Sequence, residues 1–188
     1  MANRNTAGFG LIPQGTIGST PATGGQGKYY IDAGMTVDLF QGTAVRSAAG
    51  YIVTAQAAIT NTCIGVLNGI FYNAATTLKP TFANFYKQPI TPANSEDIDA
   101  FVFDNPQQQY VVAIDAALAQ SGYLETYDMN ASAGSDTTGR SSSTLDHDDT
   151  SADDASFRLL RSAEDPENEE NAAFRSVVVC INLIELQS

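Results

Sequence analysis

The hydrophobic pattern of the chain consists of short apolar runs that alternate with polar turns. The runs are rich in β-branched and aromatic residues and recur about every ten residues, a spacing typical of strands in sandwiches and barrels. They read KYYID, LFQGTAV, YIVTAQ, IGVLNGIFYN, FANFYKQPI, IDAFVFD, YVVAID, YLETYD, SFRLLRS and FRSVVVCINLIEL. Helical periodicity is weak throughout. The pattern therefore predicts an all-β fold, a single jelly-roll-like β-sandwich or barrel formed by residues 28–188.

The run IDAFVFD shows how such a strand would be buried. In an extended strand, successive side chains point to opposite faces. Ile98, Ala100 and Val102 then point one way, while Phe101 and Phe103 point the other way. Because apolar residues occupy both sets, we expect both faces of this strand to be at least partly covered.

The first 27 residues differ from the rest of the chain. They contain seven glycines and two prolines, with large apolar residues scattered among them and no strand or helix pattern. Such a segment is either a loose terminus or an arm that becomes ordered on the surface of a partner. The second reading predicts an extended Gly-rich arm, residues 1–27, that binds its partner through Phe9, Leu11, Ile12 and Pro13.

Charge is unevenly distributed along the chain, whose net charge is −12. Residues 1–90 carry five basic and two acidic side chains, whereas residues 91–188 carry four basic and nineteen acidic ones. A chain this acidic is repelled by phosphate backbones, so nucleic acid is not an expected partner.

No apolar run approaches the ~20 residues that span a bilayer, and the first residues lack the apolar core of a signal peptide. We therefore expect no membrane partner and a chain made in a reducing cytoplasm. The two cysteines, Cys63 and Cys180, both lie in apolar runs. Without metal-type spacing, they are predicted to be buried thiols.

The stretch GRSSSTLDHDDTSADD, residues 139–154, holds the only histidine, His147. A calcium loop that starts at Asp146 would need Gly and Glu where the chain has Ser151 and Phe157. One histidine and two distant thiols are too few for zinc, and no G-x-S-x-G turn presents a nucleophile. These tests favour a solvated polar loop, so we predict no catalytic residue, no metal and no cofactor.

Sequence features along most of the chain resemble one family. They are AGFGLIPQ followed by KYYI, then GVLNGIFY, FYK, VFDNPQQQYVVAID, TTGRSSSTLD, SFRLLR, PENE and VVVCINLIELQS. In this order they are similar to the capsid decoration, or cement, proteins of tailed phages, many of them marine. The family's recurrent loop positions are occupied here by Gly139, Arg140, Ser141, Leu145, Asp146, Pro166 and Asn168. The acidity of the DHDD stretch departs from the family pattern.

The resemblance implies a non-enzymatic virion protein. It would be synthesised in the host cytoplasm, bind the major capsid protein on the outer surface of the head, and stabilise the capsid. The resemblance also implies a homotrimer, and it gives Arg140 and Asp146 structural roles in their loop.

Two other classes of protein stay open at this point. One is a carbohydrate-binding or adsorption module of a phage particle, built on a β-sandwich. The chain has no tryptophan, and most of its Tyr and Phe fall inside strand patterns, which leaves few stacking platforms such as Tyr123 or Tyr127. The other class is a hydrolase that uses His147.

Overall fold

The fold comes from a computed structural model. It describes residues 5–18, 25–55, 62–130, 132–148, 155–182 and 184–187. The strands form two sheets, and the described residues contain three short 3-10 helices and no α-helix. The predicted all-β sandwich or barrel is therefore confirmed. Across the described part of the chain, no helix is long and apolar enough to cross a membrane.

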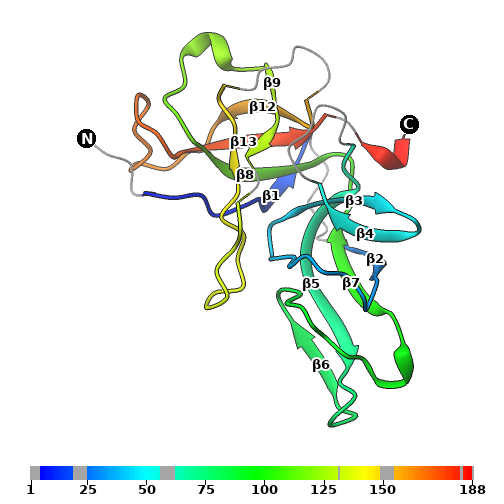
Figure 1. Cartoon of the computed structure of the whole chain (residues 1–188). Coiled ribbons are helices and arrows are strands. Elements are labelled where there is room, and N and C mark those ends of the chain that lie inside the picture. Colours follow the sequence, from blue (N-terminus) through cyan, green and yellow to red (C-terminus); the bar gives the residue numbers. More distant parts are fainter. Residues whose placement is uncertain are drawn as a thin grey trace.

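The first sheet contains seven strands and forms the upper half of the molecule in Figure 1. Its path runs β10 (Met129–Asn130), β11 (Thr144–Leu145), β8 (Gln108–Ile114), β13 (Arg175–Ile181), β12 (Phe157–Ser162) and β9 (Thr126–Tyr127). The remaining strand, β1 (Ile12–Thr16), pairs antiparallel with β8. All pairs are antiparallel except β11 with β8, which meet at a single residue pair.

The second sheet contains six strands and forms the lower half in Figure 1. Its path runs β2 (Gly27–Ile31), β7 (Ile98–Phe103), β5 (Gly65–Asn73), β3 (Ala44–Ala48) and β4 (Tyr51–Thr54). A short strand, β6 (Pro80–Ala83), forms a hairpin with the end of β5. The two ends of the path, β2 and β4, contact each other, so this sheet curls into a nearly closed barrel.

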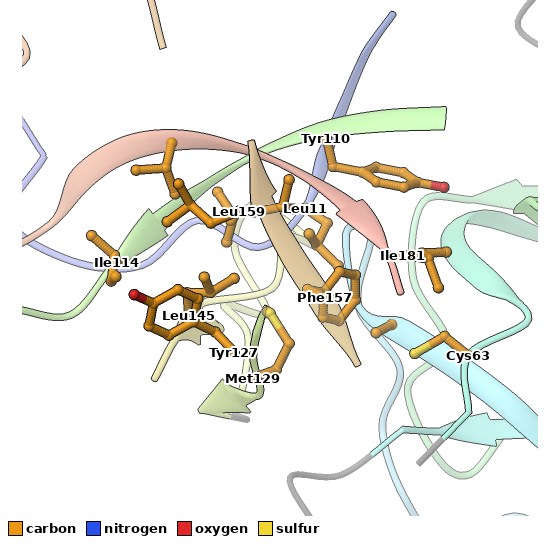
Figure 2. Close-up of a cluster of buried hydrophobic side chains, with 14 of the residues drawn as sticks. Leu11, Cys63, Tyr110, Ile114, Tyr127, Met129, Leu145, Phe157, Leu159 and Ile181 are labelled. Carbon is orange, nitrogen blue, oxygen red and sulfur yellow. The ribbon is translucent and has the colours of Figure 1, made fainter. Parts of the chain in front are cut away.

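Each sheet has its own hydrophobic core, and β5 contributes to both. Val66 lies in the core of the first sheet, and the next residue, Leu67, lies inside the curled sheet. Figure 2 shows the first core, where Phe157 and Leu159 of β12 lie among side chains from both halves of the molecule. The two sheets therefore pack against each other through shared apolar side chains.

The alternation predicted for IDAFVFD is confirmed. Ile98, Ala100 and Val102 are fully buried inside the curled sheet, whereas Phe103 points the other way and packs against the first core. The two cysteines are buried and unpaired, as predicted.

The N-terminal segment corrects an expectation. Residues 12–16, which showed no strand pattern, form β1, and Leu11 is 1% exposed within the first core. The segment is ordered because the edge of β8 satisfies its backbone hydrogen bonds, a partner that local alternation cannot reveal. Residues 12–16 thus pair with a strand of the body, and the division of the chain at residue 28 stays a prediction. Residues 1–4 and 19–24 lie outside the described residues, and capsid binding by this segment stays a prediction.

Candidate binding pocket between the two sheets

Backbone hydrogen bonds to two distant loops hold residues 9–13 in place. The Gly10 amide donates to the Ser143 carbonyl over 3.1 Å, and the Leu11 amide donates to the Gly42 carbonyl over 2.9 Å. Gly10 has a φ of +73°, and a Cβ there would lie only 2.9 Å from the Gly42 oxygen. A glycine is therefore required at this position. The fixed backbone at Gly10 sets the directions in which the side chains of Phe9 and Leu11 point.

The Gly-Arg-Ser loop is built by similar constraints. Gly139 has a φ of +68°, and a Cβ there would overlap the side chain of Asn84. The Gln41 amide donates to the Gly139 carbonyl over 3.0 Å, and the Ser141 amide donates to the Gln41 carbonyl over 2.9 Å. Ser141 is buried, and its hydroxyl lies 3.0 Å from that of Ser143. Gly139 and Ser141 thus both stabilise the conformation of the loop. Arg140, which lies between them, is exposed.

A small pocket opens where this loop, the N-terminal segment and the curled sheet meet. Its volume is about 120 Å³, close to that of cavities that hold one benzene-sized group. The lining residues are Phe9, Leu11, Ile12, Pro13, Gln41, Gly42, Leu67, Asn68, Phe103 and Arg140. The pocket therefore combines apolar walls with one cationic side chain.

The polar side chains of the pocket differ in how they are satisfied. The side-chain nitrogen Nε2 of Gln41 donates a hydrogen bond to the side-chain oxygen Oδ1 of Asn68 over 2.9 Å, so these two side chains are partners of each other. Within the part of the chain that the structure describes, the Arg140 guanidinium forms no ion pair. A guanidinium beside apolar walls suits a ligand that places a carboxylate next to one apolar group.

The structure brings together five of the six residues singled out from the sequence. Phe9, Leu11, Ile12, Pro13 and Arg140 all line the pocket, although Arg140 is far from the others in sequence. They differ in exposure, since Leu11 is 1% exposed and Ile12 is 37% exposed. Leu11 thus belongs to the wall of the pocket and to the core, and Ile12 is the residue that a partner can reach.

The sixth residue, Asp146, does not line the pocket. Its amide donates to the Asp128 carbonyl over 2.9 Å, and its side-chain oxygen accepts from the Asp148 amide over 3.0 Å. Both contacts organise a turn at the edge of the first sheet. The structural role that the resemblance implies for Asp146 stays a prediction.

Two polar residues of the pocket, Gln41 and Asn68, were not predicted from the sequence. Asn68 is a polar residue inside the apolar run IGVLNGIFYN, at a point where the pairing of β5 with β7 shifts register between Leu67 and Gly69. A polar residue within such a run could have indicated this site. Gln41 offers no such signal, because an isolated glutamine next to a glycine is common in turns.

His147 lies away from the pocket, beside Asp115 and Asp148. Its amide donates to an Asp115 side-chain oxygen over 2.9 Å, and its Nδ1 lies 3.2 Å from an Asp148 oxygen. No group of three or more His, Cys, Asp or Glu is placed to hold a metal among the described residues. Asp149 and Ser151 lie outside them, so the absence of chemistry in this stretch stays a prediction.

Tyr110 connects the two sheets behind the pocket. It is fully buried, and its hydroxyl donates to the carbonyl of Phe103, a pocket residue, over 2.9 Å. Burial raises the pKa of Tyr110 far above its ordinary value, so the hydroxyl stays protonated and keeps donating. This bond helps to hold the pocket wall rigid.

No family model matches the chain, and neither a curated protein nor a solved structure matches it. The pocket and the surfaces around it are therefore the features from which a function can be inferred.

Proposed function

We propose that the chain is a virion structural protein that binds the outer surface of a phage head and stabilises the capsid. One observation carries the proposal. Two of the motifs that carry the resemblance, the Phe-Gly-Leu segment and the Gly-Arg-Ser loop, meet at one pocket through the hydrogen bonds of Gly10 and Ser141. A shared site gives a physical reason for both motifs to occur in one chain.

The pocket supplies a mechanism for this binding. An apolar side chain of the major capsid protein would enter between Ile12 and Phe103, and a neighbouring carboxylate would pair with Arg140. Burial of one such side chain contributes about 1.5–3 kcal/mol, and a charged hydrogen bond about 1.5–3 kcal/mol. A single contact of this size is weak once association entropy is subtracted, so stable decoration requires several copies acting together.

The rigidity of the pocket favours capsid binding over a function in which the protein must close around its ligand. Its walls come from strands and from a loop fixed by backbone hydrogen bonds, so little order is lost when a partner binds. A site of this kind suits a permanent structural contact. Among the described residues that line it, the polar side chains besides Arg140 are Gln41 and Asn68, and neither is a nucleophile or a general base.

The test is a sedimentation assay on empty heads. The wild-type chain should bind in a saturable number of copies and stay bound through pelleting. Arg140→Gln should weaken binding per copy about tenfold, which corresponds to the loss of about 1.4 kcal/mol. Arg161→Gln is the matched control, because Arg161 is an exposed arginine on β12 that does not line the pocket.

Three results would count against the proposal. Failure of the wild-type chain to bind heads would refute the function itself. Equal loss with Arg140→Gln and Arg161→Gln would leave general charge, not the pocket, as the determinant. Full binding by Arg140→Gln would show that the pocket is not the contact site.

A further inference from the structure

The outer face of the curled sheet carries a group of aromatic side chains that the sequence pattern assigned to the core. Register places Tyr30 opposite Asp99, Asp99 beside Phe71, and Phe71 opposite Phe82, so these side chains share one face across four strands. Phe101, two residues along β7, lies on the same face. Tyr30, Phe71, Phe82 and Phe101 are called the aromatic face below.

The aromatic face is accessible and ends at a projecting hairpin. Phe82 is 73% exposed and Tyr30 is 46% exposed, while Phe71 and Phe101 are half-buried. The rings of Phe71 and Phe82 lie 4.6 Å apart, which gathers the apolar surface around Phe82. Figure 1 shows that the β5–β6 hairpin extends away from the first sheet, and its turn end is joined to the segment before β7, where the Ala75 amide donates to the Thr91 carbonyl over 3.1 Å.

The turn of this hairpin adds a second exposed apolar side chain. Leu78 is 70% exposed and has a φ of +55°, in the left-handed region that a bulky residue rarely adopts. The turn is closed by hydrogen bonds from the Thr77 and Leu78 amides to the Ala74 carbonyl. The turn therefore presents a large apolar side chain to water on the same hairpin that carries Phe82.

The charge distribution indicates which partner can approach this surface. Residues 39–95 contain no Asp or Glu and three basic side chains, Arg46, Lys79 and Lys87. The net charge of −12 therefore combines +3 in this stretch with −15 in the remainder. On the aromatic face itself, the only carboxylate in the row, Asp99, is paired with Lys28 over 2.7 Å.

We propose that the aromatic face and the hairpin turn at Leu78 form the contact between copies of this chain. Copies that each carry −12 repel one another through their acidic parts, and the repulsion is weakest when acid-free surfaces meet. The hairpin is that surface, and Leu78 and Phe82 provide apolar area that association would bury.

This contact differs from a salt-bridged interface in its response to ionic strength. Raising the salt concentration screens the repulsion between the acidic parts, whereas apolar burial is not weakened. Association should therefore become tighter as salt increases. An interface held by ion pairs between copies would loosen under the same change.

The experiment measures the mass of the purified full chain by light scattering at micromolar concentration. The wild-type chain should have a mass of at least twice the 19.9 kDa of one chain. Leu78→Ser combined with Phe82→Ser should reduce the mass to that of a monomer while leaving the circular dichroism spectrum unchanged. Because both residues are largely exposed, the substitutions remove little from the core.

Leu124→Ser provides the matched control. Leu124 is also a leucine with a positive φ, +68°, and is 62% exposed, but it lies beside β9 in the first sheet. This variant should keep the wild-type mass, which separates the effect of position from the effect of losing an exposed leucine.

Each remaining outcome would overturn the proposal in a recognisable way. A monomeric wild-type chain at both low and high salt would show that copies do not associate. If a monomeric chain loses head binding only with the Leu78 and Phe82 changes, the surface contacts the shell instead. If the same changes abolish binding on a glycan array, the surface is a carbohydrate platform. Self-association can also hold when head binding fails, so the two proposals fail separately.

Discussion

Substitution of Leu11 by alanine tests whether the N-terminal segment is part of the folded body. A mobile arm would lose nothing in stability from this change. In the structure, Leu11 is 1% exposed and packs within the first core, as Figure 2 shows. Its neighbour Ile12 is 37% exposed, so Ile12→Ala is a control with similar chemistry and different burial.

The expected cost follows from core truncation. Removal of a buried leucine side chain to alanine costs about 2–5 kcal/mol, part of it from the cavity that is left. For a chain of this size, each kcal/mol corresponds to about 2–4 °C in Tm, so Leu11→Ala should lower Tm by roughly 4–20 °C. Ile12→Ala should cost about 1 kcal/mol or less, because part of its side chain already contacts water.

Urea unfolding followed by tyrosine fluorescence or circular dichroism measures both variants, since the chain has eight tyrosines and no tryptophan. A difference of less than about 0.5 kcal/mol between Leu11→Ala and Ile12→Ala would refute the placement of Leu11 in the core. The result also bears on truncation experiments. Deletion of residues 2–20 removes β1 and Leu11, so loss of head binding by such a variant would report lost stability as well as lost contacts.

Two further predictions concern the buried positions Cys63 and Gly65. Burial raises the pKa of Cys63 to about 12, whereas the thiol of an unfolded chain ionises near its ordinary value of 9.0. The unfolded state then holds fewer protons between these values, so the urea midpoint should fall as pH rises from about 9 to about 12, less steeply in Cys63→Ala. Gly65→Ala should destabilise by more than about 2 kcal/mol, because a Cβ there would overlap the Phe103 carbonyl, and Gly15→Ala, with nothing within 4 Å, should not.

The sequence alone predicted the strands that carry their own pattern. IDAFVFD alternates because one face of β7 lies inside a core, and the structure places its residues as expected. β13 could be predicted for a different reason, since FRSVVVCINLIEL is apolar on both faces and the strand is buried throughout. In both cases the residues of the strand itself are enough to predict how it is buried.

The elements that sequence reasoning missed depend on partners distant in the chain. β1 has no alternation of its own, and it exists because the edge of β8 pairs with it. The aromatic face was missed for the opposite reason. Tyr30, Phe71, Phe82 and Phe101 follow the pattern of core residues, but on this part of the outer face Phe82 is 73% exposed and Tyr30 is 46% exposed. Periodicity reports that two faces differ, and it does not report which one faces water.

The two proposed surfaces have complementary energetic roles. In the proposed arrangement, the pocket at Arg140 would contact the capsid protein weakly, and association through the hairpin would present several pockets at once, which raises the effective concentration of each at the shell. Arg140→Gln would remove the proposed contact to the head and leave the hairpin intact, so it should weaken decoration without changing the mass of the free protein. Loss of Leu78 and Phe82 should lower the mass and, through lost multivalency, weaken decoration as well. A pocket variant that changed the mass would instead place Arg140 at the contact between copies.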